Sequence, residues 1–148
     1  MTRHREPHTS EDVGYAKTAK LKVMAQLGHG IHRNERIVSV TPVTVRTCGI
    51  DEQMFIVVTS STAGAEANGR VLLSFDEGVD MSVGGIFFVT EHGERKLQSA
   101  YLDSDMRGGR AMAVIVDAAQ QHGITSAVGP FSAEGLKMVK RYGFKVVE

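Results

Sequence analysis

Hydrophobic and polar positions follow the period of a helix near the start of the 148-residue chain. Between Ser10 and Gly28, apolar residues recur at three- and four-residue steps, which predicts an amphipathic helix of about five turns. Ser10 is a suitable N-cap, acidic residues follow it in the first turn, and Gly28 can close the helix in a left-handed conformation. Residues 1–9 show no apolar pattern, so we expect a flexible tail there.

From Ile37 to Leu102 the period shortens to that of β-strands. Proline cannot donate to a strand ladder, so we expect the strand containing Pro42 to lie at a sheet edge or to be bulged at that residue. The small residues 61–69 predict an exposed, mobile loop, and His92-Gly93 predicts a hairpin turn. The pattern predicts an antiparallel meander of about five strands, at Ile37–Arg46, Met54–Thr59, Arg70–Phe75, Ile86–Thr90 and Arg95–Leu102.

After Leu102, helical and strand patterns alternate. A strand, a crossover helix and a second strand in this order favour parallel pairing with a right-handed crossover. We therefore predict one α/β (α+β) domain over residues 10–148, with a mixed, mainly antiparallel sheet and a C-terminal β-α-β-α-β unit. After β-type residues end at Leu102, we predict a loop at Asp103–Gly109, a helix at Arg110–His122 and a strand at Ile124–Val128. A second helix is predicted from the N-cap Ser132 to Arg141 or Tyr142, followed by a strand at Phe144–Val147. Gly123 and Gly143 are the residues expected to end the two helices.

Composition narrows the classes of partner and compartment. Lys plus Arg balances Asp plus Glu at 17 each, so no general attraction to nucleic acid or to an anionic membrane is expected. No apolar run approaches the ~20 residues needed to span a bilayer, and the polar N-terminus lacks the apolar core of a signal peptide. The single cysteine, Cys48, has no intramolecular disulfide partner, which favours a reducing compartment. We expect a cytoplasmic protein, or one enclosed in a viral particle.

The segment from Asp103 to Ala111 is the sharpest candidate for ligand binding. Gly108 and Gly109 let the backbone approach a ligand closely, and the first amides of the following helix lack intrahelical partners. Such a helix start favours an anion, and Arg107 and Arg110 add charge-assisted donors beside it. The loop therefore predicts a site for a pyrophosphate. The alternative is that the two glycines only end a strand and begin a helix, with both arginines in solvent.

The order of elements from Leu97 to Glu148 resembles the GNAT superfamily of N-acetyltransferases. The resemblance covers about a third of the chain: a strand, an Arg-Gly-rich turn, a long helix, a short strand, a capped helix and a terminal Tyr-Gly-Phe-Lys-Val-Val strand. The family's turn follows the pattern Arg or Gln, two free positions, Gly, one free position, then Gly or Ala. Counted from Arg107, those last two positions are Arg110 and Met112.

The resemblance implies a GNAT-like fold and acetyl-CoA as co-substrate. Its pantetheine arm would run along the backbone of Ala100, Tyr101 and Leu102, and its pyrophosphate would lie on the turn. The expected cofactor-binding residues are Tyr101, Leu102, Arg107, Gly108, Gly109, Arg110 and Ala111. In the implied reaction an amine attacks the thioester directly, a carboxylate or water accepts the amine proton, and a tyrosine protonates the leaving thiolate.

The catalytic groups of the family match this chain less closely. The tyrosine five residues before the Phe of the Gly-Phe pair is Val139 here, and Tyr142 is the nearest substitute. Asp103 and Asp105 are the candidate general bases, while Glu91 and Glu94 are expected in a solvated hairpin turn. The alternative function is that of a catalytically inactive GNAT-fold protein with a structural or interaction role, for example a phage virion-associated protein within a larger assembly.

Other chemistry-bearing residues favour simpler interpretations. His29 with His32, and His4 with His8, have spacings that suit a metal, but no cysteine or acid cluster accompanies them, so no metal site is expected. Cys48 has no legible Cys/His or Ser/His/Asp arrangement around it and is better interpreted as a small buried thiol.

Overall fold

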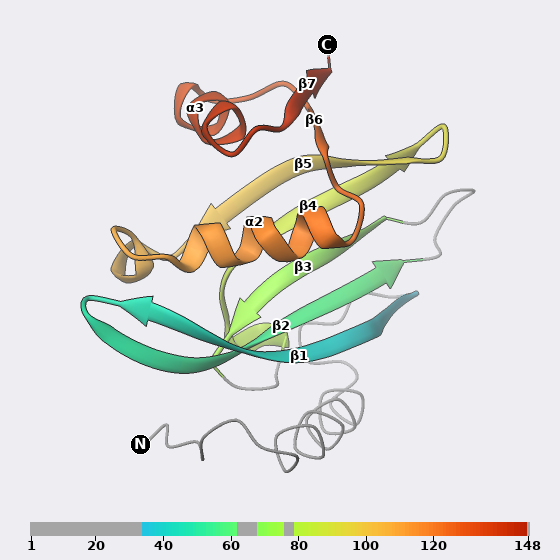
Figure 1. Cartoon of the computed structure of the whole chain (residues 1–148). Helices are drawn as coiled ribbons and strands as arrows, with labels where there is room; N and C mark the ends of the chain where they lie inside the picture. The colour runs from blue at the N-terminus through green and yellow to red at the C-terminus, as the bar shows by residue number, and fades with distance from the viewer. Residues whose placement is uncertain (1–33, 62–67, 76–78, 148) are drawn as a thin grey trace.

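The computed structural model describes residues 34–61, 68–75 and 79–147, which form one mixed sheet with two helices (Figure 1). The seven strands lie in the sheet in their order along the chain. They are β1 (Glu35–Thr47), β2 (Ile50–Ser61), β3 (Asn68–Ser74), β4 (Ser82–Glu91), β5 (Glu94–Leu102), β6 (Ser126–Val128) and β7 (Lys145–Val147), and the helices are α2 (Ala111–Gln121) and α3 (Ala133–Arg141). The predicted tail at 1–9, the predicted helix at 10–28 and positions 62–67 of the predicted loop lie outside the described residues.

The predicted antiparallel meander is confirmed, since each of β1 to β5 pairs antiparallel with the next. β1 lies at an edge of the described sheet, as its proline predicts. The register shifts between Ile37 and Ser39 rather than at Pro42, which stands opposite Phe55. The predicted turn is also confirmed: His92 and Gly93 have φ of 54° and 79°, the left-handed pair that a two-residue hairpin loop requires.

The sheet buries apolar side chains on both faces because successive residues of a strand point in opposite directions. In β2, Met54, Ile56 and Val58 join the larger core, on the face that α2 covers (Figure 1), while Phe55 and Val57 join a smaller cluster on the other face. The run of six buried residues from Met54 to Thr59 marks β2 as an interior strand. The helix side of the larger core is formed by the buried residues Ala111, Ile115, Val116 and Ala119.

The predicted parallel step is confirmed at the C-terminal end of the sheet. β6 pairs parallel with both β5 and β7. The predicted helices are present, and the left-handed residues Gly123 and Gly143, with φ of 81° and 78°, follow their ends. Neither helix of the described ranges is long and apolar enough to cross a membrane.

A buried ion pair joins the first three strands. The carboxylate of Glu35 in β1 accepts from Arg70 Nε in β3 at 2.7 Å, and Arg70 Nη2 donates to the other oxygen. The hydroxyl of Thr59 in β2 donates to the same carboxylate at 2.7 Å. The side chains of Arg70 and Glu35 are only 11% and 3% exposed, so each charge depends on its partners for the solvation it has lost.

Replacing Arg70 with Met should lower the free energy of unfolding by about 3–5 kcal/mol, because it leaves a buried carboxylate without its counter-ion. Equilibrium urea unfolding measures this change. The matched control is Arg46→Met, which breaks a cross-strand pair with Asp51 whose side chains are 59% and 60% exposed. The control should change stability by less than about 1 kcal/mol. Equal losses in the two variants would contradict the role given to burial.

Candidate ligand-binding cleft

Strand β5 pairs with a strand on both sides over only part of its length. β6 pairs with β5 only at Lys96 and Leu97. The next residue, Gln98, is also skipped in the pairing with β4, where the register passes from Leu97 to Ser99. A bulge of this kind bends the strand and increases its local twist. β5 therefore turns away from β6 immediately after their last paired residues.

The chain on the other side of this opening cannot follow β5 either. β6 ends at Val128 and is followed by Gly129-Pro130. Pro130 has no backbone N–H to donate to a neighbouring strand, and the chain continues into α3 instead. Within the described structure, the edge of β5 from Gln98 to Leu102 thus has no strand beside it. Such an edge offers backbone donors and acceptors to a ligand.

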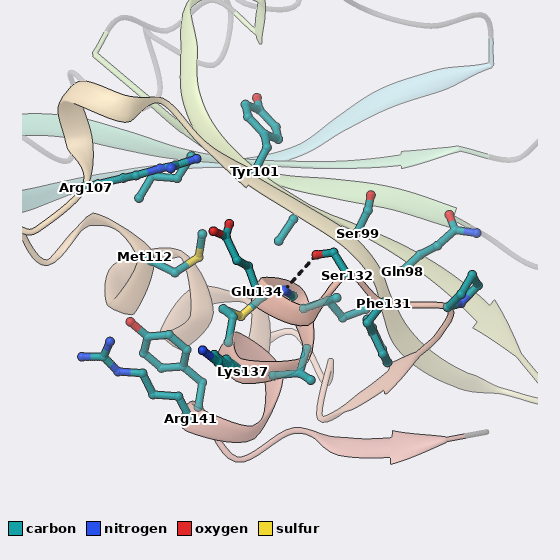
Figure 2. A pocket seen from close by; sticks show the side chains of 18 of the residues that line it. Gln98, Ser99, Tyr101, Arg107, Met112, Phe131, Ser132, Glu134, Lys137 and Arg141 are labelled. Atoms are coloured by element: carbon teal, nitrogen blue, oxygen red, sulfur yellow. Dashed lines mark hydrogen bonds between the residues drawn. The ribbon is translucent and has the colours of Figure 1, made fainter.

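A cleft of about 680 Å³ opens beside this unpaired edge (Figure 2). One wall is β5, the opposite wall is α3 with the segment leading into it, and the start of α2 closes one end. Its volume lies within the roughly 300–1,000 Å³ of small-molecule sites. The apolar part of its lining comes from Leu97, Ala100, Leu102, Met112, Phe131, Met138, Val139 and Tyr142.

The loop that contains Gly108 and Gly109, called the glycine loop below, lies at the end of the cleft and contacts the β1–β2 hairpin. The amide of Arg110 donates to the carbonyl of Arg46 at 3.2 Å. A Cβ at Gly109 would lie 3.0 Å from the same carbonyl, so a side chain there would have to move the loop or the hairpin by a few tenths of an ångström. Gly108 has φ of 83°, which favours glycine on conformational grounds alone. Both glycines are thus needed for the loop to take this course.

The contact with the hairpin determines which backbone amides of the loop are left without a hydrogen-bond partner in the protein. Of the five backbone amides from Arg107 to Ala111, on which the pyrophosphate is expected to lie, that of Arg110 donates to the carbonyl of Arg46 and that of Arg107 to the carbonyl of Ser104. In the described part of the chain, the amides of Gly108 and Gly109 have no such partner. The same holds for the first helical turn from Ala111, where intrahelical acceptors are lacking. The amides left without a backbone partner are therefore fewer than the sequence predicts and start at Gly108.

Charged side chains give the cleft a cationic character that the neutral chain as a whole lacks. Its lining contains Arg107, Lys137 and Arg141 against a single acid, Glu134. Figure 2 shows Arg107 reaching in from the β5 side and the other three from α3. An anionic ligand is favoured by this excess of positive charge.

The structure brings together most of the predicted cofactor-binding residues. Tyr101, Leu102, Arg107, Gly108 and Gly109 all line the cleft. The ring of Tyr101, however, extends to the other side of β5 (Figure 2), and its hydroxyl is 2.5 Å from that of Ser82.

Arg110 and Ala111 do not line the cleft. Arg110 borders a separate hollow of about 560 Å³, which is also lined by Val43 and Asp117, and Ala111 is fully buried in the core. Their positions differ because the helix begins between them, and the first turn directs Arg110 toward the hairpin side.

The predicted catalytic residues are divided between the cleft and its surroundings. Tyr142 is half-buried and lines the cleft. Asp103 and Asp105 are exposed at the 3₁₀ turn Ser104–Met106 and do not line it. The carboxylate inside the cleft is that of Glu134.

Sequence reasoning missed the contribution of α3 to the lining. Glu134, Lys137, Met138 and Arg141 line the cleft at helical spacing, three or four residues apart. That period marks one face of a helix and was legible in the sequence. What the sequence lacked was any sign that this face turns toward β5.

The structure does not support a reactive role for Cys48 or a metal site. Cys48 is exposed in the left-handed turn between β1 and β2, with φ of 50°. Among the described residues, no three His, Cys, Asp or Glu side chains are grouped so as to hold a metal ion. His4, His8, His29 and His32 lie outside the described residues.

Comparison with protein-family models, curated proteins and solved structures finds no match to this chain.

Ser132 both lines the cleft and caps α3, its hydroxyl accepting from the amide of Gly135 at 3.0 Å. Replacing Ser132 with Ala should lower the free energy of unfolding by about 1 kcal/mol, because the amide loses its acceptor. Ser132→Asn serves as the control and should retain most of the stability, since Asn is an equally good N-cap. Urea unfolding of both variants measures the difference, and an unchanged Ala variant would contradict the capping role.

Proposed function

We propose that the cleft binds acetyl-CoA and that the protein is an acetyl-CoA-dependent N-acyltransferase of GNAT-like architecture, transferring an acetyl group to an amine. The observation that carries the proposal is the joining of an unpaired strand edge and a glycine-rich helix start in one cleft. The edge of β5 from Gln98 to Leu102 supplies backbone groups for a pantetheine arm, whose amides can pair with it as an added strand would. The loop at Gly108 and Gly109 supplies amides and Arg107 for a diphosphate.

The surroundings of the loop support a modified alignment with the family pattern. Started at Met106 rather than at Arg107, the pattern places Gly109 and Ala111 at its two small positions. Gly109 lies against the carbonyl of Arg46, and Ala111 is fully buried, so both sites require small residues. The departure then falls on Met106, a buried apolar residue where the family has Arg or Gln.

The proposed chemistry uses groups from both walls of the cleft. A neutral amine would attack the thioester carbonyl, and the C–S bond would break as the new C–N bond forms. Tyr142 is the candidate to protonate the departing thiolate, and the amine proton would pass to water or to Glu134, the carboxylate that lines the cleft.

A second candidate function, ligand binding without catalysis in a structural or interaction role, is favoured by one observation. Val139 stands where the family has its tyrosine, and it is fully buried in the larger core. The position that carries the tyrosine in the family is therefore filled here by a side chain that packs in the core at the border of the cleft. Under this second function the cleft would still hold CoA, but no acetyl group would be transferred.

Binding is tested first, with CoA and acetyl-CoA as the ligands. Either at about 100 times its Kd should stabilise the fold by about 2.7 kcal/mol, which appears as a higher Tm. Arg107→Ala should weaken binding by about 10- to 100-fold, since it removes a charge-assisted contact to the diphosphate. Arg110→Ala, a change of the same charge outside the cleft, is the control and should leave Kd unaltered. No binding by the wild-type protein, or equal effects of the two variants, would overturn the proposal.

Catalysis is tested separately by release of free CoA from acetyl-CoA in the presence of a panel of primary amines. Tyr142→Phe should lower turnover by about 100-fold or more with little change in Kd, because the ring stays and only the proton donor is lost. Tyr101→Phe is the matched control, since that hydroxyl is directed toward Ser82. Tight binding of acetyl-CoA with no turnover in the wild-type protein would select the second candidate function.

A further inference from the structure

The second hollow, of about 560 Å³, is lined mainly by a side of α2 that does not pack in the core. Four of its lining residues recur at three- and four-residue steps and therefore share one side of the helix: Arg110, Ala113, Asp117 and Gln120. β1 contributes Val43 and Thr44, and Tyr142 comes from the C-terminal end of α3. The volume lies within the roughly 300–1,000 Å³ of small-molecule sites.

The hollow holds one positive and one negative side chain, Arg110 and Asp117. Both are exposed, and neither forms an ion pair within the described structure. Asp117 accepts a hydrogen bond from the uncharged side-chain amide of Gln121 at 2.9 Å. Seven residues of helix set the two Cα atoms about 10.5 Å apart along the axis. The hollow therefore has a cationic end and an anionic end, two helical turns apart.

The helix dipole makes the position of Arg110 unfavourable. Arg110 is the N-cap residue of α2, at the positive end of the dipole, and no acidic residue lies in the first turn. Its side chain does not line the cleft, so the ligand proposed there leaves the guanidinium without a direct partner. A carboxylate bound to Arg110 would offset the unfavourable charge and form a charge-assisted contact.

The lining between the two charges is apolar. Ala113 and Val114 lie on α2 between Arg110 and Asp117, and Val43 of β1 lines the same hollow. All three apolar side chains are half-buried, so each still exposes surface to water. A short chain of methylene groups lying on them would remove part of that surface from water, which is favourable.

We propose that the hollow binds a small zwitterion whose carboxylate and ammonium groups are separated by a short chain, as in an ω-amino acid. The carboxylate binds the guanidinium of Arg110, the ammonium group binds the carboxylate of Asp117, and the connecting chain lies between them. An α-amino acid carries its two charges close together and suits this spacing poorly. The inference does not depend on the proposed function, since the hollow shares only Tyr142 with the cleft lining.

The test is a titration of ε-aminocaproate into the whole isotope-labelled protein, followed by NMR of the backbone amides. The amides of Ala113, Val114 and Asp117 should shift and saturate, with a Kd on the order of 1 mM because the ligand has few atoms. Hexanoate and hexylamine each lack one charge and should bind about three- to tenfold more weakly. Norleucine, the isomer with its ammonium group beside the carboxylate, should be weaker by a similar factor.

Variants assign each charge to its residue. Arg110→Gln should bind ε-aminocaproate no more tightly than hexylamine and leave the Kd of hexylamine unchanged. Asp117→Asn should bind ε-aminocaproate no more tightly than hexanoate and leave the Kd of hexanoate unchanged. Lys140→Gln is the control, because it removes an exposed cation of α3 that does not line the hollow, and it should keep all the wild-type Kd values.

The proposal is overturned if ε-aminocaproate gives no saturable shift of the α2 amides, or if it binds no more tightly than hexanoate, hexylamine and norleucine. No CoA is present in this titration, so such a failure leaves the assignment of the cleft to acetyl-CoA standing. A failure of acetyl-CoA to bind would likewise leave the assignment of the hollow standing.

Discussion

Backbone groups in the interior of a sheet need partners at both edges of each strand, because a buried N–H or C=O without a hydrogen bond is unfavourable. β5 meets this requirement along one edge, against β4, but along the other only at Lys96 and Leu97. The bulge at Gln98 bends the strand away from its parallel neighbour, and Pro130 prevents the neighbouring chain from following. Everything proposed for the cleft depends on this interruption, since a continuous β6 would occupy the edge that a ligand is proposed to use.

The other walls of the cleft come from α2 and α3, which also pack in the hydrophobic core. α2 buries one side in the larger core and brings the glycine loop to the end of β5. α3 is capped by Ser132, and its Val139 packs into the same core while its polar face lines the cleft. The cationic character of the cleft arises from side chains on separate elements, so a chain of zero net charge still presents a local positive surface.

The sequence predicts the elements well because their signals are local. The alternation from Ile37 to Leu102, the turn at His92-Gly93, the cap at Ser132 and the closing glycines each depend on a few neighbouring residues, and all are present in the structure. The coarse class, a mixed and mainly antiparallel sheet with a parallel step, followed from the same signals.

The details of the site were less predictable because they depend on contacts between distant residues. Nothing near Arg110 indicates that its amide is bonded to Arg46, 64 positions earlier, or that its side chain lies outside the cleft. The bulge at Gln98 likewise depends on how β5 pairs with β4 and β6, and the residue type at position 98 does not indicate it. Asp103 and Asp105 follow β5 directly in the sequence, but the 3₁₀ turn at Ser104–Met106 leaves both out of the cleft lining.

The contact between the β1–β2 hairpin and the glycine loop is made on the hairpin side by a main-chain carbonyl. Every residue type provides that same oxygen, so position 46 can vary widely without weakening the support it gives. On the loop side the freedom is smaller, because a Cβ at Gly109 would crowd that carbonyl at 3.0 Å. Evolutionary drift at the two ends of one contact should therefore be unequal, and covariation between them would be a poor guide to their proximity.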